Sequence, residues 1–138
     1  MPATGGAAVQ ITPNGEDRDV PRESDDGRFL YYQKEYTSHC AVWRMPVGGG
    51  PETKVLDSVD CYSGWAVWQQ GIYFFTQTEE GGRSEIRYYE FATGATRRVL
   101  TVELQTTNHI AVSPDGRTIL YTQIDQFGSD LMLVENFR

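Results

Sequence analysis

The sequence is poor in the residues that build metal centres and catalytic sites. Among 138 residues it contains only two cysteines and two histidines: Cys40, Cys61, His39 and His109. A structural zinc site needs four convergent ligands, and the spacing of these residues does not resemble one. The sequence also lacks the Gly-x-Ser-x-Gly elbow that presents a nucleophilic serine. We therefore expect no metal ion, no cofactor and no catalytic residue, and we predict that the chain is not an enzyme.

Clustered positive charge and long apolar runs are missing as well. The chain has 12 basic against 19 acidic residues, a net charge of -7, and only Arg97 and Arg98 are adjacent. Nucleic-acid binding needs clustered basic residues, so we expect this segment to contact no nucleic acid. No apolar run reaches the roughly 18 residues of a membrane span, and no charged leader precedes an apolar stretch. We expect no membrane contact by this segment, and the compartment stays open.

What the sequence does contain is a unit of about 45 residues that occurs three times. One turn of the unit is marked by glycines at spacings of 44 and 45 residues: Gly5, Gly49 and Gly94. A second turn keeps the same period: Gly27, Gly71 and Gly116. A strand-rich repeat of this length is typical of propellers and solenoids, in which a unit buries its apolar faces only against its neighbours.

Each unit has enough β-forming segments for four strands, and no helix of useful length is predicted. In the first unit, the aromatic run 29–32 and the segment 41–46 precede a glycine turn and a return strand at 53–56. The small-residue and tryptophan run 63–68 fits an innermost strand of the next unit. The predicted organisation is an orphan outer strand at 7–12 and three units at about 20–57, 62–102 and 108–138.

The turn Ser113-Pro114-Asp115-Gly116-Arg117 and the strand after it resemble the repeat of TolB-like and PD40-type WD40 β-propellers. Residues 25–32 are a second good copy, whereas the copy around Gly71 lacks both the Ser-Pro-Asp and the Arg. The resemblance implies an all-β fold of four-stranded antiparallel blades. Residues 128–137 look like the end of propeller domains attached to bacterial winged-helix transcriptional regulators or serine/threonine kinases, which implies a regulatory context.

The phase of the repeats predicts an incomplete ring. The chain starts at an outer strand and ends after a third strand, so it holds three blades' worth of strands. Propellers usually have about four to eight blades, and three cannot close a ring at ordinary sheet twist. Either the chain is part of a longer protein, or two copies complete a six-bladed ring as a homodimer in which each strand at 7–12 pairs with a third strand near Val134.

Strand facing predicts which residues are buried between blades. The expected core consists of large apolar side chains: Trp43, Trp65, Trp68, Phe75, Tyr88, Ile119 and Leu131. Cys40 opens a third strand and Cys61 precedes the innermost strand of the next unit, so a bridge would have to span neighbouring blades. We therefore predict free buried thiols rather than a disulfide.

A binding site is expected at the channel mouth, where the loops that enter the innermost strands and the loops between second and third strands converge. The candidate ligand-binding residues come from these loops and the strands they enter: Arg18, Asp19, Arg22, Tyr62, Trp65, Asn108 and His109. Both histidines are expected in loops of this face, and Trp65 is better suited to the core between blades than to ligand contact.

The predicted function is that of a non-catalytic protein-interaction or ligand-sensing module of a bacterial regulatory protein. Its partner would be a protein or small molecule at the top face, in addition to a second copy of the chain. The alternative is the substrate-gating propeller of a hydrolase or peptidase. An upstream winged helix or kinase would favour the first function, and an α/β-hydrolase domain would favour the second.

Overall fold

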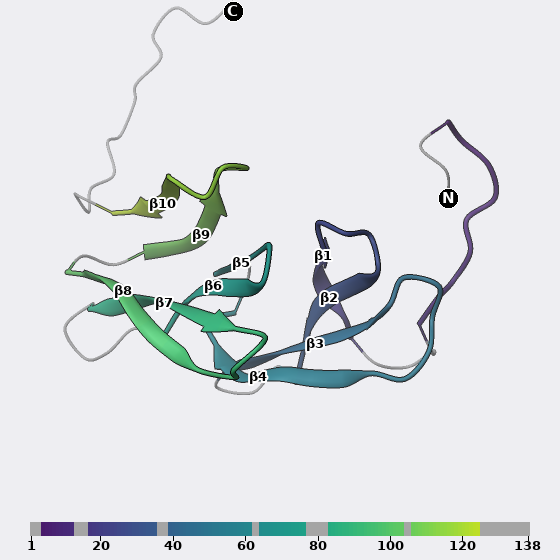
Figure 1. Cartoon of the computed structure of the whole chain (residues 1–138), viewed down its shortest axis with the longest axis horizontal. Coiled ribbons are helices and arrows are strands. Elements are labelled where there is room, and N and C mark those ends of the chain that lie inside the picture. The colour runs from purple at the N-terminus through teal and green to yellow at the C-terminus, as the bar shows by residue number, and fades with distance from the viewer. Residues whose placement is uncertain are drawn as a thin grey trace, which may run out of the picture.

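The structure, a computed structural model, describes residues 4–12, 17–35, 39–61, 64–76, 83–103 and 106–124. Within these ranges the chain forms ten β-strands and no helix, which confirms the all-β class (Figure 1). In the same residues there is consequently no helix that could cross a membrane. All strand pairings are antiparallel.

The strands form three sheets in chain order. The first sheet has four strands: β1 (Asp19–Glu23), β2 (Phe29–Lys34), β3 (Cys40–Pro46) and β4 (Thr53–Val59). The second sheet also has four: β5 (Trp65–Trp68), β6 (Gly71–Phe75), β7 (Ser84–Glu90) and β8 (Thr96–Val102). The third described sheet has two: β9 (Thr106–Val112) and β10 (Ile119–Gln123). In every sheet, strands adjacent in the sequence are adjacent in space, so each hairpin forms locally.

The three sheets pack face to face, and their first strands lie on one side. β5 contacts both β1 and β9, whereas β4 and β8 lie on the opposite side of their sheets (Figure 1). Side chains alternate along each strand, so one face of the first sheet meets the second sheet and the other face does not. No described residue covers the outer face of the third sheet at Leu120, which is 69% exposed.

Two apolar clusters fill the spaces between the sheets. The cluster between the first and second sheets is built from Tyr31, Val42, Trp65, Ile72 and Phe74, with other residues around them. The cluster between the second and third sheets is built from alternate residues of β6, β7 and β9 and includes Tyr73, Phe75, Ile86 and Ile110. This pairwise packing is the reason why a single sheet is not a stable unit.

The predicted core is confirmed at five positions and is wrong at Trp43. Trp65 and Phe75 are fully buried. Three further side chains are half-buried and pack against the cluster between the second and third sheets: Trp68, Tyr88 and Ile119. Trp43 lies on the free face of the first sheet, since its strand neighbour Val42 faces the second sheet. Leu131 lies outside the described residues.

Two hairpin turns have the same internal structure, as the repeat predicts. In turn 24–28 and in turn 113–117, the serine hydroxyl donates to the aspartate at 2.7 and 2.6 Å. The same aspartate oxygen accepts the arginine backbone N–H at 3.1 Å in both turns. The glycine has φ +68° in both, a left-handed conformation that glycine adopts without strain. Local chemistry therefore fixes these turns independently of the sheets around them.

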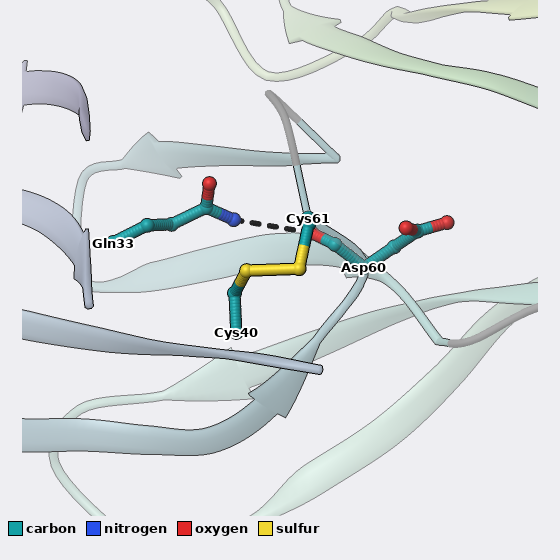
Figure 2. Close-up of a disulfide and its surroundings, with 4 residues drawn as sticks. All are labelled: Gln33, Cys40, Asp60 and Cys61. Atoms are coloured by element: carbon teal, nitrogen blue, oxygen red, sulfur yellow. Dashed lines mark hydrogen bonds between the residues drawn. A yellow bond between two sulfur atoms is a disulfide. The ribbon is translucent and has the colours of Figure 1, made fainter. Parts of the chain in front are cut away.

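The prediction of free cysteines is wrong, because Cys40 and Cys61 form a disulfide (Figure 2). Cys40 pairs with Val59 across β3 and β4, so the chain leaving β4 passes Cys40 only two residues later. The Cα atoms are 5.2 Å apart, well within the range of a disulfide. The bridge therefore does not span two sheets. It ties the first sheet to the connection that leads into β5.

A hydrogen-bond pair holds the same connection. The Gln33 side-chain amide donates to the backbone carbonyl of Asp60 at 3.1 Å (Figure 2), and the Asp60 N–H donates to the Phe75 carbonyl at 3.1 Å. Gln33 is fully buried, so this bond satisfies a polar group that would otherwise be costly to bury. Burial raises the pKa of the Asp60 carboxyl, and a backbone hydrogen bond at Cys61 opposes that rise.

Residues 7–12 belong to no strand of the single chain. The carbonyl of Ile11 lies near the β3–β4 turn, where a Cβ added to Gly49 would be 3.5 Å away from it. The predicted pairing of this segment with a third strand near Val134 involves residues outside the described ranges, and it stays a prediction.

Candidate functional site

The structure distributes the described members of the predicted site over three neighbouring strands, β1, β5 and β9. Arg18 and Asp19 stand at the start of β1, and Asp19 is exposed. Arg22 is half-buried in β1 and donates to the Pro21 carbonyl at 3.1 Å. Trp65 is a fully buried member of the first apolar cluster, so it serves the core.

The remaining candidates belong to β9, the first strand of the third sheet, or precede β5, the first strand of the second sheet. His109 is an exposed residue inside β9, so its predicted loop position is wrong: the strand already begins at the β-branched Thr106. Asn108 also belongs to β9. Tyr62 lies outside the described residues. A ligand contact by these residues stays a prediction.

Arg18 belongs to an ion cluster on the free face of the first sheet. Glu52 forms ion pairs with Arg18, at 2.7 Å, and with Lys34. The guanidinium of Arg18 lies over the Tyr32 ring at 5.9 Å, and the ammonium of Lys34 lies over the Trp43 ring at 4.7 Å. These long side chains cover the aromatic rings and keep their own charges paired.

The electrostatics of the cluster depend on Glu52. Burial by itself would raise the pKa of this carboxyl, but contacts with Lys34, Tyr32 and Arg18 outweigh it and lower the pKa to about 2. Burial and the neighbouring Glu52 raise the pKa of Tyr32, whose buried hydroxyl makes no hydrogen bond of good geometry. Glu52 therefore joins two cations on this face and links β2 to the residues that flank β1 and β4.

A groove of about 620 Å³ opens between the first two sheets. It lies at the end of the sheets that carries the β1–β2, β5–β6 and β7–β8 turns, opposite the end where β1 begins. Its lining combines aromatic, guanidinium, carboxylate and amide groups: Ser24, Asp25, Asp26, Arg28, Phe29, Tyr31, Arg44, Gln69, Gln70, Phe91 and Ala92. We take this groove as the candidate binding site, because polar groups and aromatic rings converge in one concave surface.

The apolar part of the groove is built from stacked rings. Tyr31 of β2 stacks on Phe91 of the β7–β8 turn with ring centroids 5.5 Å apart and planes at 13°. Two guanidinium groups lie over the Phe29 ring, that of Arg44 at 4.7 Å and that of Arg28 at 5.8 Å. Burial raises the pKa of the Tyr31 hydroxyl, and Arg44 beside it acts in the opposite direction.

The carboxylates of the groove are engaged in holding its walls. Asp26 accepts from Ser24 and from both the side chain and the backbone of Arg28, and these hydrogen bonds lower its pKa to about 2. Asp25 accepts the backbone N–H of Gln69 at 2.8 Å, which joins the turn of the first sheet to that of the second. Asp25 and Asp26 therefore shape turns.

The arrangement is suited to binding a ligand. In the described part of the chain, no group of three or more histidine, cysteine or acidic side chains could hold a metal ion. The sequence indicates Phe29 and Tyr31 as strand residues but gives no signal for the groove, since Arg44 and Phe91 approach them only after the sheets have packed.

The chain matches no protein-family model, and a search of curated proteins finds no similar protein.

Proposed function

We propose that the chain is a non-catalytic binding module built from β-propeller blades, of the kind found in bacterial regulatory proteins. The observation that carries the proposal is the placement of β1, β5 and β9 side by side in consecutive antiparallel sheets that pack face to face. Successive blades of a propeller are arranged in this way, with the first strands innermost. The repeated turns 24–28 and 113–117 support the same assignment.

The charged groups of the chain support a binding role rather than a catalytic one. The carboxyls with lowered pKa values are all held by structural partners: Asp26, Glu52, Glu85 and Asp115. Asp26 and Asp115 shape turns, Glu52 joins the ion cluster, and Glu85 pairs with arginines of β7 and β8. The groove between the first two sheets offers a partner protein or small molecule a concave surface.

We propose further that two copies complete a six-bladed ring. In the described part of the chain no further sheet packs on the outer face of the first sheet, which the ion cluster covers in part, or on that of the third sheet. Each outer face carries apolar side chains that are at least partly exposed: Leu30 and Trp43 on the first sheet, Leu120 on the third. A two-fold ring brings the first sheet of one chain against the third sheet of the other and covers both faces.

The disulfide supports an oxidising compartment as the place where the module works. Disulfides persist outside the reducing cytosol, and Cys40 and Cys61 are both engaged in this one. The module would then sit on the extracytoplasmic side of a bacterial regulatory protein.

A substitution on the third sheet tests the ring. Leu120→Asp places a charge on the proposed joint and is expected to weaken self-association at least tenfold in sedimentation velocity. Val99→Asp is the control, because Val99 is also exposed but lies on the outer strand β8. Equal self-association of Leu120→Asp and the parent chain would refute the proposed ring.

A further inference from the structure

We propose that the groove between the first two sheets binds a carboxylate with an apolar neighbour, and that Arg44 is the residue that recognises it. This inference rests on the proposed role of the groove as a binding surface, but it does not depend on ring closure. Both a chain-terminal carboxylate and an acidic side chain of a partner polypeptide have this chemistry.

Arg44 carries a charge that no described carboxylate neutralises by an ion pair. Several other arginines differ in this respect: Arg18 pairs with Glu52, Arg28 with Asp26, Arg83 with Glu103, and Arg87 and Arg98 with Glu85. A guanidinium presents planar N–H donors that match a carboxylate, and such pairs are among the strongest hydrogen-bonded contacts in proteins. An incoming carboxylate would supply the counter-charge that Arg44 lacks.

The surroundings of Arg44 fix its guanidinium for this role. The guanidinium carbon lies 4.7 Å from the centroid of the Phe29 ring, which holds the group beside β2, and a guanidinium has five N–H donors, more than the Tyr31 hydroxyl can accept. The Tyr31 hydroxyl lies beside it and adds a neutral hydrogen-bonding group. Arg44 belongs to β3, a strand paired on both sides, so its backbone is held rigidly.

Neither aspartate of the groove supplies the counter-charge for Arg44. Asp26 is engaged by Ser24 and Arg28, and its charge is offset by the Arg28 guanidinium at 2.7 Å. Asp25 accepts the Gln69 N–H across the joint between the sheets. Both carboxylates therefore hold turns, and the ion-pair position at Arg44 is left for a group from outside the described chain.

The opposite wall favours an apolar group next to the carboxylate. Tyr31 and Phe91 form a stacked pair, and Ala92 follows Phe91 along the same wall. An aromatic or aliphatic side chain adjacent to the bound carboxylate would contact these rings, and contact between apolar groups strengthens binding through the area it removes from water.

Titration of the labelled chain with small probes in proton–nitrogen correlation spectra tests the inference. N-acetylphenylalanine supplies a terminal carboxylate and an aromatic ring, and N-acetylphenylalaninamide is its neutral match. We expect saturable shifts of the amides of Phe29, Tyr31, Arg44 and Phe91 with the acid, and at least tenfold weaker binding of the amide. The α-amide of N-acetylglutamate replaces the terminal carboxylate by a side-chain carboxylate, and whichever acid binds more tightly identifies the source that the site prefers.

A matched pair of variants tests whether the charge of Arg44 binds the acid. Arg44→Gln is expected to weaken binding of the acid at least tenfold. Arg97→Gln should leave it unchanged, because Arg97 also lies over a ring, that of Tyr88 at 5.0 Å, but belongs to the outer strand β8. Equal binding of acid and amide, shifts confined to other surfaces, no shift at all, or equal loss in both variants would each overturn the inference. A dimeric chain whose groove amides do not respond would refute this inference alone and leave the proposed ring intact.

Discussion

The turns 24–28 and 113–117 have the same internal hydrogen bonds but different surroundings. In the second turn, Trp68 of β5 packs so closely on Gly116 that an added Cβ would lie 2.1 Å from its ring, and the indole N–H approaches the Pro114 carbonyl at 3.4 Å. In the first turn, the corresponding Cβ on Gly27 would meet only Glu23, at 3.4 Å. One turn is closed by an aromatic side chain, and the other borders the open groove.

This difference shows how a repeat can provide both structure and a binding surface. The local motif sets the shape of each turn, whereas the neighbouring sheet decides whether the space beside it is filled. Between the second and third sheets, Trp68 fills the space beside the turn 113–117. Beside the turn 24–28 no side chain of the second sheet takes this place in the described residues: the Asp25–Gln69 hydrogen bond links the turn to the second sheet, and the groove remains.

The largest expected loss of unfolding free energy comes from the apolar cluster between the first and second sheets, and the cluster between the second and third sheets should lose less. Trp65→Ala removes a fully buried side chain from the first joint and should cost about 3 to 5 kcal/mol of unfolding free energy. Trp68→Ala removes a partly exposed side chain that packs between the second and third sheets and should cost less, about 2 to 4 kcal/mol, in proportion to the apolar area lost. Urea unfolding of both variants measures the difference, and a cost for Trp68→Ala as large as that for Trp65→Ala would contradict it.

Loss of the disulfide should weaken the first joint selectively. The bridge closes a loop with a sequence separation of 21 residues, and its removal by the paired change Cys40→Ala and Cys61→Ala is expected to cost about 3 kcal/mol. Hydrogen exchange should then accelerate in β3 and β5 more than in β9 and β10. The parent chain under reducing conditions should behave like the variant, and an unchanged stability there would argue against this role of the bridge.

The two turn glycines allow a direct comparison of the surroundings. Gly27→Ala should cost about 1 to 2 kcal/mol, the strain of a left-handed residue with a side chain. Gly116→Ala carries the same strain and also forces Trp68 to move, which should add about 1 to 3 kcal/mol. Thermal unfolding followed by circular dichroism compares the variants, and equal destabilisation would show that Trp68 does not close the second turn.

A smaller, pH-dependent effect is expected at the ion cluster. The folded-state pKa of Glu52 is lowered to about 2 from an ordinary value of 4.5, so its contribution is fully present above that ordinary value and is lost as pH falls towards 2. Glu52→Gln should flatten the acid limb of the stability profile. Asp26→Asn, at a carboxyl of equally low pKa in an exposed turn, should flatten it less, and the reverse order would contradict the assignment.

The sequence predicts the features that depend on neighbouring residues. Turn glycines, the Ser-x-Asp-Gly-Arg motif and aromatic strand runs act within one hairpin, so the two turns and the antiparallel strands follow from them. The disulfide could not be predicted in this way. Its two cysteines meet because β4 pairs with β3 through an irregular register between Cys40 and Val42, which a strand pattern does not reveal.

The groove is unpredictable from the sequence for a similar reason. Its residues come from two strands, β2 and β3, and from three turns, and the stacking of Tyr31 on Phe91 requires the two sheets to be packed. The prediction of channel-mouth residues depends on their loop positions in the sequence. Packing instead places Trp65 in the core and pairs Arg18 with Glu52, because large apolar and charged groups are stabilised where they find partners.

The central claim is that three blades are half of a ring, and the mass of the chain in solution tests it most directly. Light scattering at micromolar concentration should give twice the chain mass of 15.6 kDa, and removal of the first twelve residues should lower the stability of that dimer. A monomer at this concentration, or a dimer of unchanged stability after the truncation, would contradict the claim.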